Sequence, residues 1–420
     1  MDSPSTTNTA LQGILVADAT QALAGPFLGM LLGDLGADVI KVERPDGGDQ
    51  ARGWGPPFVG TESTYYLAVN RNKRSLTCNF KSAEGLSVLS RLVDRADVVL
   101  TNERRRATLQ GRGADYEQVV RCNPRVVYCS ITGFGMSGPN EGRAGYDVIA
   151  QGMAGLMPIT GPQDSVPMRY PASIADLATG MYGLSCILAA LLVRERTGQG
   201  QYIDLSLLES QAWWGVTQAV AYLMSGRAPG KLENDHPYIV PYGAFKARDG
   251  YFIIGCGSEP LWAALCQVLG LEGVRDDPRF CSNRERVLHR AEVRQLLEAK
   301  LAERGVDEWC ALFDQAEIPA GPINGIPEML QDRQMRGRGF VVEQDHPTLG
   351  ALQLLASPLH LSDTPATYRR PPPLLGQHTD EVLAELGYSQ AETGELHARG
   401  AVWGGTAQRK TQGVGAGRTA

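Results

Sequence analysis

Apolar runs alternate with amphipathic segments along the first half of the chain, and the alternation predicts strands and helices in turn. Short runs rich in Val, Ile and Leu have the length and composition of buried strands. They cover residues 14–20, 38–44, 75–80, 97–101, 125–132 and 202–208. Helical patterns separate most of them and cover residues 25–35, 82–96 and 115–122. This order favours an α/β fold with a mostly parallel sheet covered on both faces.

The longest helical pattern follows Asp176 and ends in Arg194, Arg196 and Gly198. Cations in a last turn and a glycine just beyond it are typical of a helix C-terminus. Asp176 stands where an N-cap residue belongs, and the free N–H groups of a helix start would favour its ionised form. An ionised, partly desolvated carboxylate on a rigid element can act as a nucleophile. Capping is the commoner role of such an aspartate, and the segment alone leaves both readings open.

A change in composition near residues 225–230 predicts a domain boundary. A hairpin pattern around residues 249–250 and several helical segments follow, and a turn-rich return at 318–324 precedes short strands. We therefore expect a large domain whose N-terminal part covers residues 1–224 and whose C-terminal part covers 333–403. A smaller α+β domain, residues 225–332, is inserted between them. The Gly-, Thr- and Arg-rich tail at 404–420 is expected to be disordered.

Composition and charge exclude several classes of protein. The 420 residues carry a formal net charge of −6, which argues against a nucleic-acid partner. The eight cysteines form no C-x-x-C pair and the six histidines are scattered, so no metal site is expected. The polar N-terminus lacks the apolar core of a secretory signal, and the apolar runs are interrupted before they reach membrane-spanning length. These features predict a cytoplasmic protein with no membrane partner.

Motifs spread from residue 11 to 395 resemble those of the class III coenzyme A transferases, the family of formyl-CoA and carnitine CoA-transferases. Each motif is weak alone, and their shared order makes the resemblance specific. The matching segments are residues 23–26, 35–45, 47–49, 70–76, 123–128, 130–135, 176–180, 196–200, 318–322 and 374–383.

The resemblance implies a fold and partners. Members of this family have a Rossmann-like large domain built from both chain ends, with a smaller domain inserted between. Two ring-like chains interlock as a homodimer. The substrates implied are an acyl-CoA and a small carboxylic acid, and no cofactor is bound permanently because coenzyme A is itself a substrate.

The resemblance also implies a nucleophile, Asp176. Its carboxylate would attack the thioester of the donor, releasing CoA thiolate and leaving an aspartyl anhydride. The thiolate would then form an aspartyl-CoA thioester, which a free acid would attack in turn. A carboxylate nucleophile fits because CoA passes between groups of similar acyl-transfer energy. Such intermediates hydrolyse, so the site must exclude water.

Further site residues follow from the resemblance position by position. A glycine loop that would stabilise the oxyanion is placed at Gly255, Cys256, Gly257 and Ser258, and Tyr146 matches a tyrosine of the substrate site. Arg169 lies near the nucleophile in sequence and could pair with the second carboxylate of a dicarboxylic acid, or could be a surface arginine. The implied CoA contacts are Leu23, Ala24, Gly25, Arg44, Cys78, Asn79, Phe80, Lys81, Asn102, Glu103, Arg104 and Arg143.

Two alternatives remain at this level. An α-methylacyl-CoA racemase of the same superfamily would carry a histidine where this chain has Tyr146. A tyrosine is a poor base at neutral pH because its unperturbed pKa is about 10, which favours transfer over racemisation. A catalytically silent CoA-binding protein of the same fold is the second alternative, and the retained Asp176 argues against it.

Overall fold

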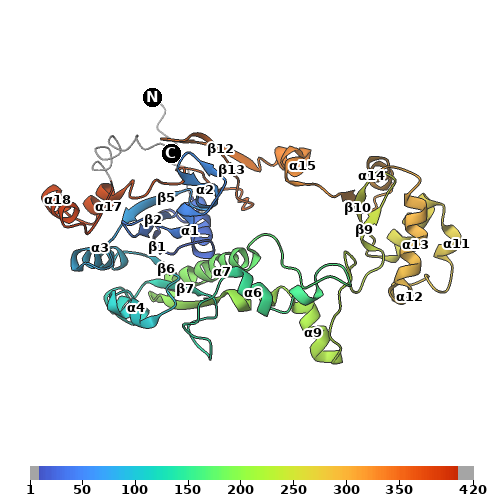
Figure 1. The fold of residues 1–420 in the computed structure, drawn as a ribbon, viewed down its shortest axis with the longest axis horizontal. Helices are drawn as coiled ribbons and strands as arrows, with labels where there is room; N and C mark the ends of the chain where they lie inside the picture. Colours follow the sequence, from blue (N-terminus) through green and yellow to red (C-terminus); the bar gives the residue numbers. More distant parts are fainter. Residues whose placement is uncertain (1–8, 405–420) are drawn as a thin grey trace, which may run out of the picture. The chain divides into compact units, whose positions relative to one another are not determined.

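The computed structural model describes residues 9–404 and divides into two compact units (Figure 1). The first unit draws on both ends of the chain and comprises the N-terminal segment to residue 155, residues 170–216 and the segment from residue 338 onward. The second unit comprises residues 156–169 and 217–337, where the sequence pattern placed a small domain at 225–332. The predicted disordered tail, apart from Gly404, lies outside the described residues.

The first unit is built on a six-stranded sheet in the order β5-β2-β1-β6-β7-β8, and every neighbouring pair is parallel. Because the chain adds strands on one side of β1 and then on the other, the order reverses between β1 and β6. Such a switch point opens a crevice at the carboxyl edge of the sheet. The strands are β1 (Leu15–Ala19), β2 (Asp38–Glu43), β5 (Lys73–Thr77), β6 (Val98–Thr101), β7 (Val127–Thr132) and β8 (Gln201–Ser206).

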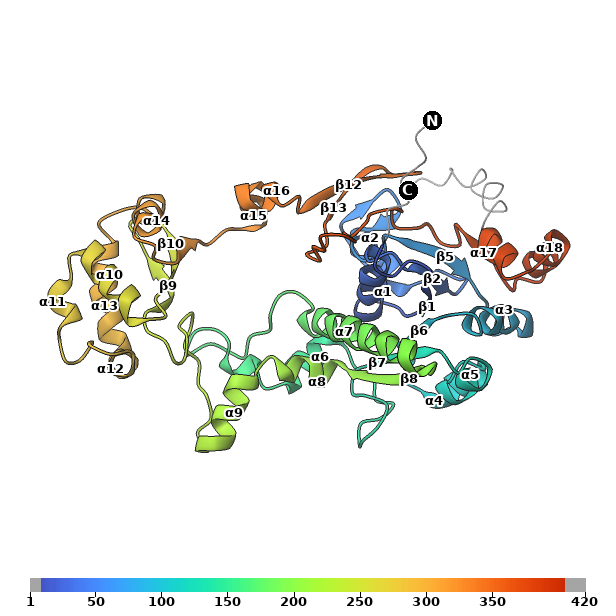
Figure 2. The ribbon, with the colours of Figure 1, turned by 180° about the vertical axis from the view of Figure 1, so that it is seen from behind.

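Helices cover both faces of this sheet, as Figure 2 shows from behind. Neighbouring strand residues point to opposite faces, so Val16 joins one core and Ala17 the other. The first core includes α1 and α7, and the second includes α3, α5, α17 and α18. Burial on both faces explains why the strands read as continuous apolar runs. The bounds are α1 (Ala24–Asp34), α3 (Ala83–Val93), α5 (Tyr116–Cys122), α7 (Ile174–Thr197), α17 (Thr379–Glu385) and α18 (Gln390–Ala398).

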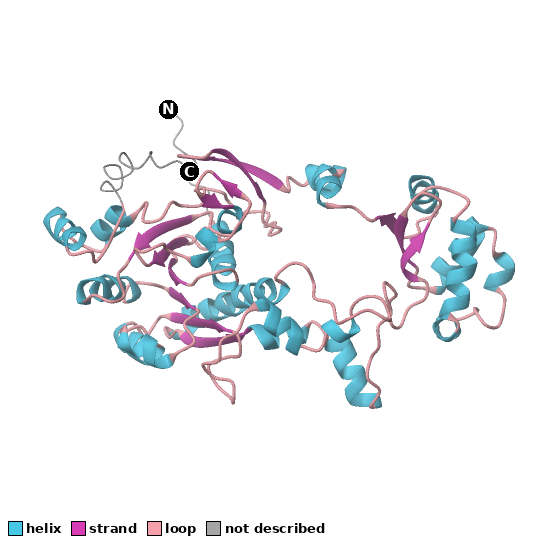
Figure 3. Ribbon diagram, viewed as in Figure 1, coloured by secondary structure: helices cyan, strands magenta, loops and turns pink. Residues whose placement is uncertain are grey.

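Shorter elements complete the first unit (Figure 3). The hairpins β3–β4 and β12–β13 are both antiparallel. The remaining elements are η1 (Gln50–Gly53), β3 (Phe58–Val59), β4 (Glu62–Ser63), α2 (Thr64–Ala68), α4 (Arg106–Gly111), α6 (Asp147–Met153), α8 (Leu207–Trp213), β12 (Val341–His346) and β13 (Gly350–Leu355).

The second unit has its own hydrophobic core under a three-stranded antiparallel sheet, ordered β11-β10-β9. The hairpin expected around residues 249–250 is present as β9 and β10. Helices pack Trp262, Phe313 and other apolar side chains against it. The elements are η2 (Met157–Ile159), α9 (Val216–Ser225), β9 (Tyr242–Lys246), β10 (Tyr251–Gly255), α10 (Glu259–Leu269), α11 (Glu272–Arg275), α12 (Asn283–Leu288), α13 (Arg290–Leu301), α14 (Val306–Gln315), β11 (Ala320–Pro322), α15 (Ile326–Gln331) and α16 (Arg333–Gly337).

Helix α7 corrects one expectation from sequence. With 24 residues and a mean hydropathy of 1.7 over its most apolar window, it is long and apolar enough to cross a membrane by length and composition alone. The core helix of a globular domain passes the same test. Here α7 packs against α1 and the sheet, and its Arg194 is held in an ion pair with Asp97 at 2.8 Å.

Candidate active site

Asp176 lies in the first turn of α7 but is not its N-cap, which corrects the sequence interpretation. The cap position is Ser173, whose side chain makes no capping hydrogen bond. At the other end Gly198 adopts the left-handed conformation (φ 74°) that closes the helix, as the sequence indicated. Asp176 is the third residue of the helix. Its side chain therefore projects from a rigid backbone, and packing fixes its direction.

Two glycines on α7 let it approach α1 very closely. A Cβ on Gly180 would lie 2.7 Å from Phe27 Cδ1 and 3.1 Å from the carbonyl oxygen of Ala24, and one on Gly183 would lie 2.6 Å from Leu28 Cδ2. Asp176 precedes these glycines by four and seven residues, so all three positions share a helix face. The close approach brings the Ala24 backbone N–H, at the start of α1, into a hydrogen bond with the Asp176 carboxylate.

The environment of Asp176 raises its pKa to about 7, from an ordinary value of 3.8. Burial is the main cause, the nearby Asp147 carboxylate adds to it, and the Ala24 N–H partly offsets both. The expectation that helix N–H groups would favour the ionised form therefore gives the wrong net direction. Desolvation and a like charge outweigh the hydrogen bond, so the carboxylate holds its charge at a cost.

Asp147, which sequence reasoning missed, is the first residue of α6 and is buried. Its Oδ1 accepts the Ala175 backbone N–H at 2.8 Å, and its Oδ2 accepts Gln151 Nε2 at 2.7 Å. The Gln151 side chain also accepts the backbone N–H of Tyr170 at 2.8 Å. Asp147 and Gln151 therefore fix the chain that leads into α7. The sequence signal that could have pointed to Asp147 was its position, because it directly follows the predicted substrate residue Tyr146 and begins a helix.

Tyr65 of α2 is a second residue that the sequence did not reveal. Its pKa is raised by burial, its hydroxyl hydrogen-bonds to Ser173, and the Asp176 and Asp147 carboxylates act on it in the same direction as burial. A neutral tyrosine hydroxyl is therefore held beside the start of α7. Tyr146, the predicted substrate residue, caps α6 and is 57% exposed.

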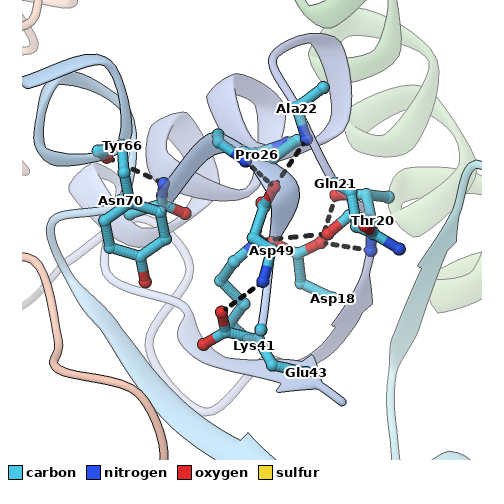
Figure 4. Close-up of polar contacts among 12 residues, drawn as sticks. Asp18, Thr20, Gln21, Ala22, Pro26, Lys41, Glu43, Asp49, Tyr66 and Asn70 are labelled. Atoms are coloured by element: carbon cyan, nitrogen blue, oxygen red, sulfur yellow. Dashed lines mark hydrogen bonds and ion pairs between the residues drawn. The ribbon is translucent and has the colours of Figure 1, made fainter. Parts of the chain in front are cut away.

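Residues 20–26 join β1 to α1 and include the first residues of α1, and we call them the 20–26 turn. They carry the first set of predicted CoA contacts, Leu23, Ala24 and Gly25, all of them buried. Ala22 in this turn has a positive φ of 70°, which is unfavourable for a residue with a Cβ. Figure 4 shows buried side chains from β1, β2 and the loop after β2 converging on the turn. Across the switch point, Asn102 Nδ2 donates to Gln21 O at 2.9 Å.

The other predicted CoA contacts in the first unit follow the carboxyl ends of strands. Arg44 directly follows β2, Cys78–Lys81 follow β5, Asn102–Arg104 follow β6, and Arg143 lies in the segment after β7. Since all six strands are parallel, these segments meet at one edge of the sheet, where ligands of such folds bind. Arg44, Lys81 and Arg143 are exposed.

Several of these side chains have structural partners of their own. Cys78 is fully buried, which raises the pKa of its thiol to about 12, and its backbone N–H donates to Glu43 O at 2.7 Å. Asn79 Nδ2 donates to the carbonyl oxygen of Gly400, and Arg104 donates to that of Gly142. The Arg112 guanidinium lies 4.8 Å from the centre of the Phe80 ring and 3.8 Å from the Glu103 carboxylate.

The remaining predicted residues belong to the second unit. Ser258 caps α10, where its Oγ accepts the Leu261 N–H, and the Cys256 thiol is buried with its pKa raised to about 12. A Cβ on Gly257 would meet nothing within 4 Å, so the loop backbone is open there. Arg169 is exposed. The oxyanion role of Gly255–Ser258 and the carboxylate role of Arg169 stay predictions.

The described part of the chain, residues 9–404, contains no group of three or more His, Cys, Asp or Glu side chains arranged to hold a metal ion. The reactive features are instead a partly buried carboxylate at the start of one helix and the backbone N–H of another. They stand beside the carboxyl edge of a parallel sheet with an open switch point. The fold and this site are those of an α/β protein with a ligand crevice at the carboxyl edge of its sheet, and a partly desolvated carboxylate can act as a nucleophile there.

Comparison with known proteins identifies the class. The chain belongs to CoA-transferase family III, whose family description matches residues 11–379. It is 43% identical over 393 residues to the succinyl-CoA:glutarate CoA-transferase of Mus musculus, covering 93% of this chain and 90% of the mouse protein. It is also 43% identical over 382 residues to the succinate–glutarate CoA-transferase of Agrobacterium fabrum, covering 90% of this chain and 95% of that protein.

A solved structure supports the same placement. A CaiB/BaiF family protein from Brucella suis matches with a TM-score of 0.80 and 41% identity, covering 90% of this chain and all of that one. The protein is therefore a CoA-transferase that uses CoA thioesters, as the sequence resemblance implied.

Proposed function

We propose that the protein transfers coenzyme A from succinyl-CoA, or a closely related acyl-CoA, to a free dicarboxylic acid of the size of glutarate. Two relatives that are each 43% identical to it carry the names succinyl-CoA:glutarate CoA-transferase and succinate–glutarate CoA-transferase. The observation that supports a covalent route is Asp176, a partly buried carboxylate with a raised pKa and a single backbone donor, at the closest approach of α1 and α7.

The proposed route keeps atoms and charge in balance. The Asp176 carboxylate attacks the donor carbonyl, the carbon–sulfur bond breaks, and CoA leaves as thiolate. The thiolate attacks the Asp176 carbonyl of the anhydride, releasing the donor acid as carboxylate and forming an aspartyl-CoA thioester. The acceptor carboxylate displaces CoA thiolate from this thioester, and the thiolate then attacks the acceptor carbonyl. Asp176 is regenerated, and neither ATP nor a metal ion takes part in these steps.

The residues around Asp176 have defined roles in this route. The Ala24 N–H donates to the carboxylate in the free enzyme, and in the anhydride it is placed to donate to the acyl oxygen. Asp147 and Gln151 fix the entry to α7 and so limit the directions from which a thioester reaches Asp176. Burial of the carboxylate keeps water from a site whose intermediates hydrolyse.

The decisive experiment combines product analysis with trapping. The enzyme is incubated with succinyl-CoA and a panel of mono- and dicarboxylic acids, and new thioesters are measured by mass spectrometry. We expect glutaryl-CoA to form and hydroxylamine added during turnover to label the peptide that contains Asp176. Asp176→Ala should abolish transfer while leaving CoA binding intact. Labelling of another residue, or transfer by the Asp176→Ala protein, would contradict the proposal.

We also propose that the working enzyme is a homodimer. Helix α7 leaves Met181, Leu188, Leu192 and Val193 exposed on the face opposite its contact with α1, from 37% to 61% of each side chain. An apolar stripe of this size on a long helix is typical of a surface that a partner covers, and a second copy of the chain fits the sequence resemblance. Light scattering after gel filtration tests this, and a mass of a single chain at assay concentration would refute it.

A further inference from the structure

Two lysines and two aspartates, all fully buried, contact residues 20–26 with their charged ends. Figure 4 labels three of them, Asp18, Lys41 and Asp49. Lys41 Nζ lies 2.8 Å from Asp49 Oδ2, Lys73 Nζ lies 2.9 Å from Asp18 Oδ2, and all four side chains have no exposed area. We call these four residues the ion network. Burial alone would raise the pKa of Asp18, but Lys73 and Lys41 bring it below its ordinary value. Burial lowers the pKa of Lys73 to about 8, so the pair of Lys73 and Asp18 is ionised at neutral pH and Lys73 loses its charge above about pH 8.

Each member of the network reaches a backbone group of residues 20–26 with its charged end. Lys41 Nζ donates to Thr20 O at 3.0 Å, and Asp49 Oδ1 accepts the Ala22 N–H at 3.0 Å. Lys73 Nζ donates to Pro26 O at 2.7 Å. Asp18 accepts the backbone N–H of Thr20 at 3.0 Å and its hydroxyl. The turn is thus held at both ends and in the middle.

Stability alone does not account for such a network. Buried ion pairs lose so much hydration that apolar replacements of similar volume are often equally stable or more stable. What an apolar core cannot provide is directed hydrogen bonds to backbone groups of a strained turn. Ala22, with its positive φ, needs such support because that conformation is unfavourable for a residue with a Cβ.

Ala24 lies within the segment 20–26 that the ion network holds, and its N–H donates to Asp176. Gly25 fixes the position further, because a Cβ there would lie 2.4 Å from the Thr20 side chain. We propose that the ion network of Asp18, Lys41, Asp49 and Lys73 is a positioning device that aims the Ala24 N–H at the Asp176 carboxylate. This inference rests on the proposed role of Asp176 as nucleophile and extends it to residues that touch neither substrate nor Asp176.

Two substitutions of Asp49 separate positioning from stability. Asp49→Asn keeps an oxygen that can accept the Ala22 N–H but loses the charge facing Lys41, whereas Asp49→Ala loses both. Both should lower the melting temperature, since both leave Lys41 with less compensation. Positioning predicts that kcat falls at least about tenfold in Asp49→Ala and much less in Asp49→Asn, with KM for the acyl-CoA nearly unchanged.

The pH profile provides a readout that a purely structural role would not move. The charged group that raises the pKa of Asp176 is Asp147 from α6, and these substitutions leave it unchanged. The nearby Tyr65 of α2, whose pKa is raised by burial and by the Asp176, Asp147 and Asp49 carboxylates, loses the contribution of Asp49 in both variants, so the comparison of Asp49→Ala with Asp49→Asn cancels that change. Weakening the Ala24 N–H bond removes the interaction that lowers the pKa of Asp176. The acid limb of kcat/KM should therefore move to higher pH, by roughly half a pH unit or more in Asp49→Ala.

A matched control lies elsewhere on the same sheet. Arg74 is a buried cation on β5, and its guanidinium binds Asp38, Glu381 and Glu385 rather than residues 20–26. Arg74→Met should lower the melting temperature without moving kcat or the acid limb. An acid limb unchanged in Asp49→Ala, or shifted equally in Arg74→Met, would overturn the inference.

If Asp49→Ala does not fold, the paired variant Lys41→Met/Asp49→Asn takes its place. It leaves neither partner of that pair as a lone charge, and it removes the Lys41 bond to Thr20. An unchanged acid limb in that variant would equally overturn the inference. A failure of the proposed function gives a different result from a failure of this inference. If the proposed function is wrong, the Asp176→Ala protein retains transfer, regardless of the effect of the Asp49 substitutions.

Discussion

Replacing Asp176 by asparagine should make the protein more stable at alkaline pH while abolishing transfer. The pKa of Asp176 is about 7 in the folded protein and 3.8 for an ordinary aspartate. The folded state therefore binds the proton more tightly than the unfolded state does. The ionised carboxylate then opposes folding, and this cost is absent below pH 4, grows as pH rises from about 4 to 7, and is complete above 7.

The magnitude follows from the size of the pKa difference. A difference of about 3 between the two pKa values corresponds to about 4 kcal/mol at 1.36 kcal/mol for each pH unit. Asparagine has nearly the same shape and carries no charge, so it removes this cost. For a domain of this size, we expect the melting temperature of Asp176→Asn to exceed that of the wild type by roughly 5–8 °C at pH 8.

Thermal unfolding of both proteins from pH 4 to pH 8.5 measures the effect, and the difference between them is the quantity of interest. It should be near zero at pH 4 and level off above pH 7. Glu43→Gln supplies a control of opposite sign. Burial would raise the pKa of Glu43, but Arg52 brings it to about 2, so its carboxylate stabilises the fold above about pH 4.5 and loses this effect toward pH 2.

Glu43→Gln should therefore destabilise the protein most at neutral and alkaline pH. A melting-temperature difference for Asp176→Asn that does not change with pH would refute the reasoning, because only the titration of a strained carboxylate produces the pH dependence. A loss of stability at pH 8 would show that the carboxylate is well solvated or paired, and the proposed activation of Asp176 would lose its physical basis.

Two further predictions concern the surroundings of Asp176. Asp147→Asn removes the like charge and should move the acid limb of kcat/KM to lower pH by roughly one pH unit, which a pH–rate profile measures; no movement would contradict the contribution of Asp147. Gly180→Ala places a Cβ against Phe27 and the Ala24 carbonyl, so α7 should shift away from α1, with kcat falling and a loss of stability of about 1–3 kcal/mol. Gly394→Ala, on α18 with open space around it, should leave activity unchanged and stabilise slightly. Equal effects of the two alanines would contradict the close-packing explanation.

The sequence predicted the strands and helices of the first unit because burial on both faces of a parallel sheet leaves a clear pattern of apolar runs. Their ends were less accurate. The strand expected at 75–80 is β5 (Lys73–Thr77), and the run expected at 202–208 ends at Ser206, whose hydroxyl caps α8. The N-cap position of the late helix α17 is His378, whose side chain makes no capping hydrogen bond. Strand ends and caps depend on which backbone groups find partners, and apolar periodicity does not encode that.

The sequence pattern did not predict the order of the strands in the sheet. Which strand pairs with which follows from long-range contacts, and the reversal between β1 and β6 is what brings Gln21 and Asn102 together. Resemblance placed CoA contacts in both segments without showing that they touch. Here geometry adds a reason for the location, because a switch point leaves adjacent loops free to diverge around a ligand.

The candidate nucleophile was visible in the sequence, but its protonation was not. Helix position predicts N–H groups near Asp176, and this local effect is the only one that the segment itself contains. The stronger effects come from residues distant in the chain: burial against α1, and the Asp147 carboxylate that α6 places beside it. Like charges that meet only through tertiary packing leave no pattern of spacing, so the direction of the pKa shift required the structure.

The raised pKa also bears on how the reaction is driven. In the proposed route, acylation of Asp176 would neutralise the same carboxylate that protonation neutralises, and both changes would relieve the cost of a desolvated charge beside Asp147. An environment that increases the affinity of the carboxylate for a proton therefore also increases its affinity for an acyl group, by up to about 4 kcal/mol here. The Ala24 N–H opposes this in the resting enzyme, yet it can transfer its hydrogen bond to the acyl oxygen once the anhydride forms. Asp147→Asn, which lowers the cost of the charge, should consequently hold less of the enzyme in covalent form during turnover, even at a pH where Asp176 is fully ionised in both proteins.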